Sequence, residues 1–178
     1  MVLESLFGRD PGAEVATALY EAVVAQARQP AFYLHCGLPD SLDGRFEMIA
    51  LHSFLVLRRL RALGPEAEAI AQSFVDTLVL DLDRSLREMG VGDLGVGKRV
   101  QRMAAGFHGR ITAYDQGLAA GSGELEAALR RNVFGTTSPE PGQVSAMAAY
   151  LRREVAAAPD PGLLAGKVGF GPPPEPAA

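Results

Sequence analysis

Apolar residues recur every three or four positions along most of this chain, which is the spacing of one face of an α-helix. The clearest case places Ile70, Phe74, Leu78, Leu82 and Leu86 at steps of four. Such repeats, and the Pro and Gly residues that interrupt them, predict helices over residues 10–29, 42–63, 65–89, 96–119, 124–134 and 143–158. No alternating pattern typical of strands is present, so the predicted fold is all-α.

The segments between these helices have three different patterns. Residues 31–38 are apolar and end at Pro39, which predicts a non-helical or single-turn connector packed on the core. Residues 90–97 contain four glycines and predict a turn. The final twenty residues contain six of the twelve prolines, which is typical of a disordered tail. We therefore expect a single-domain bundle of about six helices over residues 1–158 and a disordered Pro/Gly-rich tail over residues 159–178.

The segment 42–63 contains the longest strongly apolar stretch of the chain. Its apolar stripe extends almost around the full circle, which predicts a central, buried helix. The strongly apolar part runs only from Met48 to Leu57 and contains His52 and Ser53. A helix that spans a membrane needs about 20 apolar residues, so no spanning helix is predicted.

Composition and charge narrow the classes of protein. Hydrophobic residues make up 48% of the 178 residues and charged residues 21%, which is enough to build a core and excludes a wholly disordered chain. The formal net charge is −4, whereas dedicated nucleic-acid binders are usually basic. We therefore expect no DNA partner, although four arginines stand against Glu47 alone between residues 45 and 61.

Cys36 is the only cysteine, so an internal disulfide is impossible and a reducing compartment is expected. The first ten residues have neither a basic segment nor a long apolar one, which argues against a secretory signal. These features predict a cytoplasmic protein, with peripheral attachment to the inner membrane as an open alternative.

The glycine-rich turn matches two phosphate-binding spacings. Gly90, Gly92 and Gly95 have the spacing of a dinucleotide fingerprint, and Gly92-x4-Gly97-Lys98 resembles a phosphate-binding loop. Both motifs require a preceding strand, whereas residues 81–89 read as helix, and Arg99 stands where the loop needs Ser or Thr. The turn therefore predicts a helix break and no nucleotide site.

No constellation of residues indicates catalysis. The three histidines (His35, His52 and His108) and Cys36 are scattered, with no pair at i, i+4 that would suggest a metal site. No nucleophile with a partner base has a recognisable local signature. We expect no catalytic residue, no metal and no cofactor, and hence no enzyme.

Several long segments resemble the ubiquinol–cytochrome c chaperone family. They are ARQPAFY at residues 27–33, GLPDSLDGRFEM at 37–48, LRRLR at 57–61, DLDRSLREMGVGDLGVGKRV at 81–100 and FHGR at 107–110. The resemblance covers about residues 19–134. It implies a helical assembly factor for the cytochrome bc complex (complex III) that binds newly made cytochrome b and supports its haem loading. Mitochondrial relatives work near the ribosome exit, and this form resembles a bacterial cytoplasmic version.

Charge and position, and not the family, suggest which residues contact a partner. A nascent membrane protein exposes apolar helices with basic flanks, so its chaperone needs an apolar groove with charged edges. The predicted apolar and acidic contact set, in which Leu42 completes the groove wall, consists of Phe32, Tyr33, Leu38, Asp40, Asp43, Arg45 and Phe46. The predicted basic set, which would face anionic lipid or ribosomal RNA, consists of Arg58, Arg59, Arg61, Lys98, Arg99 and Arg102. Simple core cover and helix-end stabilisation are the structural alternatives for these residues.

Two other functions stay open at this point. A helical nucleic-acid-binding regulator would use the Arg-rich helix ends and bind with steep salt dependence. A haem- or small-molecule-binding protein would need a pocket that the sequence does not reveal.

Overall fold

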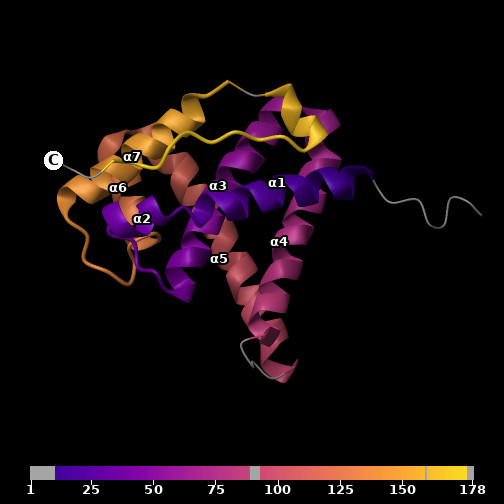
Figure 1. The fold of residues 1–178 in the computed structure, drawn as a ribbon, viewed down its shortest axis with the longest axis horizontal. Helices are drawn as coiled ribbons and strands as arrows, with labels where there is room; N and C mark the ends of the chain where they lie inside the picture. Colours follow the sequence, from indigo (N-terminus) through magenta and orange to yellow (C-terminus); the bar gives the residue numbers. More distant parts are fainter. Residues whose placement is uncertain (1–10, 89–92, 159, 176–178) are drawn as a thin grey trace, which may run out of the picture.

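The computed structural model describes residues 11–88, 93–158 and 160–175. Over these ranges the chain forms helices and no strand, so the predicted all-α fold is confirmed (Figure 1). In order, the elements are α1 (Pro11–Ala27), α2 (Pro30–His35), α3 (Leu42–Leu63), the short 3-10 helix η2 (Pro65–Ala67), α4 (Glu68–Glu88), α5 (Asp93–Ala120), α6 (Ser122–Arg131), α7 (Pro141–Ala156) and the 3-10 helix η3 (Pro161–Ala165).

Most helix ends lie within a few residues of the prediction, and two segments differ more clearly. The connector predicted over residues 31–38 contains the six-residue helix α2, which begins at Pro30 because proline fits the first helical position. Its Phe32 is fully buried, as the predicted packing on the core requires. Helix α5 begins at Asp93, so part of the predicted glycine-rich turn is helical. Residues 89–92 of that turn lie outside the described residues.

Helix α3 is the centre of the fold, as its apolar pattern predicts. Ser41 caps its first turn by accepting a hydrogen bond from the Gly44 amide at 3.2 Å, and residues 50–57 are all buried. One side of α3 packs with α2, α5, α6 and α7 in one apolar cluster, which includes Phe54. The other side packs with α1, α4 and η3 in a second cluster, which includes Phe74. The helix therefore joins two halves of the core.

Helices α4 and α5 contact each other and project together from the rest of the bundle (Figure 1). The far end of α5 then packs closely on α6. A Cβ atom on Gly117 of α5 would lie 2.8 Å from the Cα atom of Leu125 in α6, so any larger residue would push the helices apart. Gly117 therefore permits the close approach of α5 and α6.

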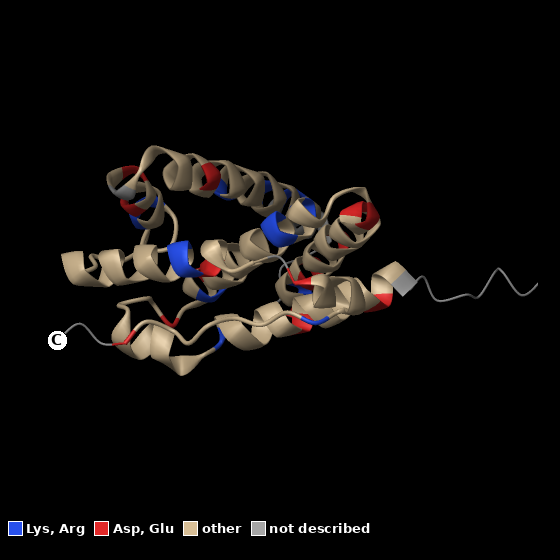
Figure 2. Cartoon of the chain, turned by 90° about the horizontal axis from the view of Figure 1, so that it is seen from above, with Lys and Arg blue, Asp and Glu red and all other residues tan. Residues whose placement is uncertain are grey.

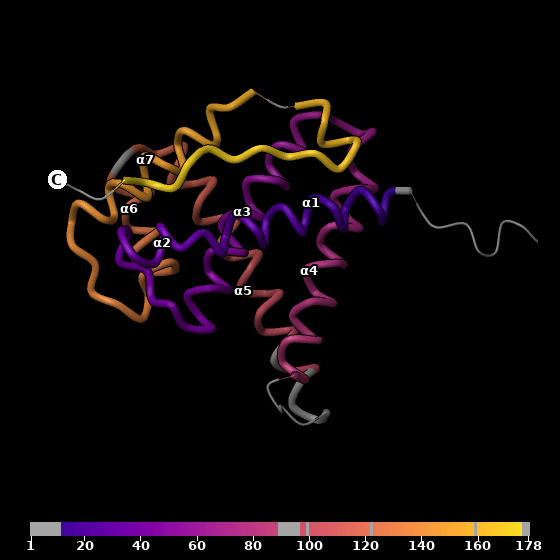
Figure 3. The backbone as a smooth tube through the Cα atoms, in the orientation of Figure 1, coloured from indigo at the N-terminus to yellow at the C-terminus, as the bar shows by residue number. Residues whose placement is uncertain are grey.

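The tail requires a correction, because residues 160–175 pack against the helices instead of being disordered. Leu163 in η3 is fully buried, and the following residues run in an extended form along α7 and over α1 and α3 (Figure 3). Proline and glycine prevent helix formation here, but side chains of distant helices supply hydrogen bonds to the tail. The composition of the tail indicates the absence of an α-helix but cannot indicate these hydrogen bonds.

None of the helices in the described part of the chain combines the length and the apolar character needed to cross a membrane.

Candidate functional site

An apolar cleft lies where the end of α3 meets η2 and the start of α4. Its volume is about 920 Å³. Its floor is apolar and its edge is polar. The floor is made by Leu57, Leu60, Ala67, Ala71, Val75 and Ile111, and the edge by Arg61, Glu68 and Gln72. We call this feature the α3–α4 cleft.

The turn between α3 and α4 produces the cleft. Gly64 ends α3 with φ of +88°, a conformation that favours glycine, and Pro65 begins η2. The chain then reverses, so that α4 contacts α3 and, more extensively, α1. Small side chains such as Ala71 face the gap and leave it unfilled. The sequence signal for the turn is the Gly64-Pro65 pair, but the cleft itself depends on the angle between the helices.

The charged edge of the cleft contains one of the predicted contact residues. Arg61 is exposed and pairs with Asp115 of α5 at 3.6 Å, and Arg58 also pairs with Asp115. Glu68 lies on the edge, and Glu66 in the adjoining η2 is also exposed. The cleft thus presents an acidic side near the start of α4 and a basic side near the end of α3.

A second cleft, between α1 and α4, has a different character. Its volume is about 660 Å³, and charged side chains such as Glu21, Arg28 and Asp81 line it. The Tyr20 hydroxyl donates a hydrogen bond to Asp81 across it at 2.8 Å. Its lining is apolar in about the same proportion as that of the α3–α4 cleft, but its charged groups come from both walls, α1 and α4.

The predicted apolar contact set does not form a groove. Phe32 and Leu38 are buried in the core, so for these two residues the surface placement is corrected. Tyr33 is half-buried, and its hydroxyl donates to the Ala27 carbonyl at 2.7 Å. Phe46 is partly buried beneath the Arg110 guanidinium, 5.3 Å from the ring centroid.

The predicted charged residues near the start of α3 do lie on the surface. Asp40 and Arg45 are exposed and pair at 2.7 Å, and Asp43 is exposed in the first turn of the helix. Two leucines beside them, Leu34 and Leu42, are also exposed. This part of the predicted site is an exposed mixed surface and not a cleft.

The predicted basic set is divided among three environments. Arg59 is buried and pairs with Glu154 of α7 at 3.1 Å, so its assignment to a surface patch is corrected. Arg58 and Arg61 are exposed or partly exposed but paired with Asp115, and Lys98 and Arg102 are exposed on α5. The side chain of Arg99 lies outside the described residues. Figure 2 shows basic and acidic positions interspersed over the helices.

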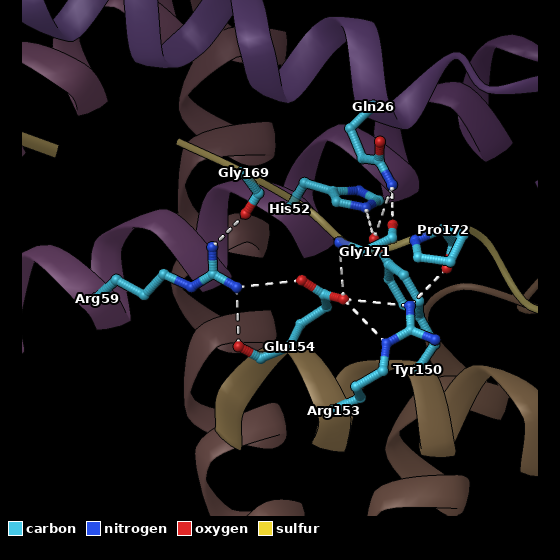
Figure 4. Close-up of polar contacts among 9 residues, drawn as sticks. All are labelled: Gln26, His52, Arg59, Tyr150, Arg153, Glu154, Gly169, Gly171 and Pro172. Atoms are coloured by element: carbon cyan, nitrogen blue, oxygen red, sulfur yellow. Dashed lines mark hydrogen bonds and ion pairs between the residues drawn. The ribbon is translucent and has the colours of Figure 1, made fainter. Parts of the chain in front are cut away.

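A buried polar cluster connects α1, α3 and α7 with the tail (Figure 4). Its central ion pair is Arg59 with Glu154, and Arg59 also donates to the Glu154 carbonyl at 2.9 Å. His52 Nδ1 lies 2.8 Å from the Met48 carbonyl, which can only accept, so this nitrogen carries the proton. His52 Nε2 therefore accepts from the Tyr150 hydroxyl at 2.8 Å. Both ring nitrogens of His52 therefore have a hydrogen-bond partner, one as donor and one as acceptor.

This arrangement predicts a pH dependence of stability. Burial lowers the pKa of His52 to about 4, because the cationic ring would lose its hydration. The ordinary pKa is 6.5, so between pH 6.5 and 4 the unfolded chain takes up a proton that the folded chain excludes. We expect the free energy of unfolding to fall by roughly 3 kcal/mol as pH decreases through this window. Urea unfolding at several pH values measures it.

The control for this prediction is His52→Gln, which removes the titrating ring. The variant is expected to be less stable at pH 7, but its stability should vary less between pH 6.5 and 4 than that of the natural chain. Equal pH slopes for both proteins would show that His52 is not the group responsible.

Comparison with known proteins gives consistent matches. The model of a family described as "Ubiquinol-cytochrome C chaperone" matches residues 34–169. A crystal structure of "the Cbp3 homolog from Brucella abortus" is 36% identical in sequence, covers 91% of each chain and superposes with a TM-score of 0.78. The matched range includes the α3–α4 cleft and most of the ordered tail.

Two curated relatives come from eukaryotes. "Ubiquinol-cytochrome c reductase complex assembly factor 1" of Mus musculus is 26% identical over 140 residues, which are 79% of this chain and 48% of the relative. "Protein CBP3, mitochondrial" of Saccharomyces cerevisiae is 30% identical over 107 residues, which are 58% of this chain and 32% of the relative. The chain thus spans about half the length of the mouse protein and about a third of the length of the yeast protein.

Proposed function

Because this chain belongs to the ubiquinol–cytochrome c chaperone family, we propose that it is an assembly factor for ubiquinol–cytochrome c reductase and that its client is newly made cytochrome b. The mouse relative is named as an assembly factor of this complex, which supports the proposal. We place the client-binding site in the open α3–α4 cleft, because this cleft combines an apolar floor with a charged edge.

The cleft has the chemistry that an unassembled membrane helix requires. A helix binds in a groove through side chains at i, i+3 and i+4, which enter an apolar floor such as that formed by Leu60, Val75 and Ile111. Membrane helices carry Lys and Arg at their cytoplasmic ends. Glu66 and Glu68 at one end of the cleft offer opposite charge to such a flank. The charged edge therefore gives a bound helix a preferred direction.

The remaining surface residues have a secondary role in this proposal. Lys98 and Arg102, exposed on α5, would contact anionic lipid heads at the inner membrane face or the ribosome that makes the client. Asp40, Asp43 and Arg45 would contact a flanking loop of the client. Each of these contacts would be electrostatic and would weaken as salt concentration rises.

The lining of the α3–α4 cleft does not favour haem as the ligand of this cleft. Haem iron is held by His, Cys, Met or Tyr side chains, and none of these lines the α3–α4 cleft in the described part of the chain. The nucleic-acid alternative is disfavoured by the pairing of Arg58, Arg59 and Arg61 with carboxylates, which uses charge that phosphate contacts would need.

A charge placed in the cleft tests the proposal. Val75→Asp puts a carboxylate on the apolar floor, where an apolar helix cannot hydrogen-bond it. We expect about tenfold less cytochrome b to co-purify with this variant, since about 1.4 kcal/mol of lost binding energy suffices. Affinity purification from cells that make cytochrome b, followed by quantitative mass spectrometry, measures the amount.

The matched control is Leu80→Asp, the same type of change on the same helix. Leu80 is 70% exposed and lines the α1–α4 cleft instead of the α3–α4 cleft, so this variant should retain the natural amount of cytochrome b. If Val75→Asp and the natural chain, both folded, retained equal amounts, the cleft would not be the client site.

A further inference from the structure

The tail segment 167–174, which we call the strap, crosses a face made by α1, α3 and α7. It follows η3, whose Leu163 is fully buried, and it has no helical structure of its own (Figure 3). Its Lys167, Gly169 and Pro172 are exposed. The strap is thus a peptide lying on the surface of a helical bundle, fixed at its N-terminal end by η3.

The helices bind the strap mainly through its backbone. Arg59 donates to the Gly169 carbonyl at 2.8 Å, and Gln26 donates to the Gly171 carbonyl at 3.0 Å. The Gly171 amide donates to Glu154 Oε1 at 3.1 Å, and Arg153 donates to the Pro172 carbonyl (Figure 4). Backbone groups are common to every polypeptide. These backbone contacts alone would accept an extended chain of any sequence.

One side chain of the strap adds specificity. The ring of Phe170 meets the His52 ring edge to face, with centroids 5.2 Å apart, and lies 5.5 Å from the guanidinium carbon of Arg59. Gly169 and Gly171 flank it and leave the neighbouring backbone accessible to the helices. The recognised feature is an aromatic residue between residues without bulky side chains.

The groups that hold the strap also hold one another. Arg59 pairs with Glu154 at 3.1 Å, and His52 and Tyr150 are hydrogen-bonded at 2.8 Å, through contacts that involve no strap atom. The face is therefore organised by α3 and α7 themselves. A preorganised face can bind another peptide of the same chemistry without rebuilding its side-chain contacts.

We propose that this face is a peptide-binding site whose resident ligand is the strap, and that a partner polypeptide replaces the strap with an extended segment carrying an aromatic residue next to glycine or proline. A partner is favoured as the second occupant because the contacts are to backbone atoms, which any extended segment supplies. The proposal does not depend on which complex the chain serves or on the α3–α4 cleft.

Gly171→Val tests the proposal by a change in the strap and not in the sequence of the face. A Cβ atom at Gly171 would lie 2.6 Å from Glu154 Oε1 and 2.8 Å from Arg153 Nη2, so valine disrupts the contacts of the strap with these two side chains and weakens its hold on the face. The matched control is Gly169→Val, because a Cβ atom at Gly169 meets nothing within 4 Å. The probe is a fluorescein-labelled synthetic peptide with the natural sequence of residues 166–175, added to the full-length proteins.

Fluorescence anisotropy should show at least about tenfold tighter peptide binding to Gly171→Val than to the natural chain or to Gly169→Val, whose own strap competes at high effective concentration. The same peptide with Phe170 replaced by Ala should bind weakly to all three. A Gly171→Val protein with natural helicity that does not bind the natural peptide would overturn the proposal.

If Gly171→Val fails to fold, amide hydrogen exchange of the natural chain tests the proposal instead. Strap amides that exchange much faster than those of α3 would support a replaceable strap. Strap amides that exchange only together with α3 would show that the strap is a permanent part of the fold and would overturn the proposal. A strap-exchanged dimer of the natural chain would identify a second copy as the occupant and would overturn the assignment to a partner.

Discussion

Replacing Glu154 by alanine is expected to lower the free energy of unfolding by about 3 to 5 kcal/mol. Glu154 and Arg59 have side chains that are 4% and 9% exposed, so water cannot replace the lost carboxylate. The substitution leaves the Arg59 guanidinium buried without its counter-charge, and the Gly171 amide loses its acceptor. Chemical denaturation monitored by circular dichroism gives the change.

The control for this prediction is Glu88→Ala. Glu88 also pairs with an arginine, Arg84, at 3.0 Å, but these side chains are 66% and 80% exposed. An exposed pair contributes at most about 1 kcal/mol, so the control should change stability little. Similar losses for the two variants would mean that burial does not distinguish the Arg59–Glu154 pair.

The second large effect is expected for Phe32→Ala, with a loss of about 3 to 5 kcal/mol. Phe32 is fully buried and packs edge to face against His52 and Tyr150, with ring centroids 5.5 and 5.3 Å away. Its removal leaves a cavity between α2, α3 and α7. The same denaturation experiment measures the loss.

Leu34→Ala, in the same short helix, is the matched control. Leu34 is 74% exposed, so we expect a change within about 0.5 kcal/mol. The comparison also decides between two roles of Phe32. A stable Phe32→Ala protein that had lost only partner binding would restore the surface role predicted from the sequence.

Helical periodicity predicted the fold because the helices of this chain are long and bury regular apolar faces. The steps of four from Ile70 to Leu86 correspond to α4, and the nearly continuous apolar circle of α3 correctly indicated a central helix. The helix ends were less predictable, because capping and packing together determine them. Helix α5 thus begins at Asp93, within the glycine-rich segment.

The burial of Arg59 had a local signal that its neighbours concealed. Arg58, Arg59 and Arg61 look like one basic surface group in the sequence, but Arg59 continues the buried face formed by His52 and Leu55 at helical spacing. Its acidic partner, Glu154, is 95 residues away in sequence. Periodicity can show the face, but only the fold can show the partner.

The cleft and the ordered tail are tertiary features, and for that reason sequence patterns did not predict them. The Gly64-Pro65 pair indicated a helix break, but the gap beside Val75 depends on how α4 packs after the break. The tail has a composition typical of disorder. It is ordered because Gln26 and Arg59, on two other elements, bind its backbone.

The central claim, that this chain supports assembly of ubiquinol–cytochrome c reductase, is tested most directly by the amount of the assembled complex in its native cells after deletion of the gene. Haem b absorbance and native gels of the membranes measure it. We predict that the complex falls to a small fraction of its normal level, and that the natural chain and Leu80→Asp restore it whereas Val75→Asp does not. A normal level of assembled complex in the deletion cells would contradict the account.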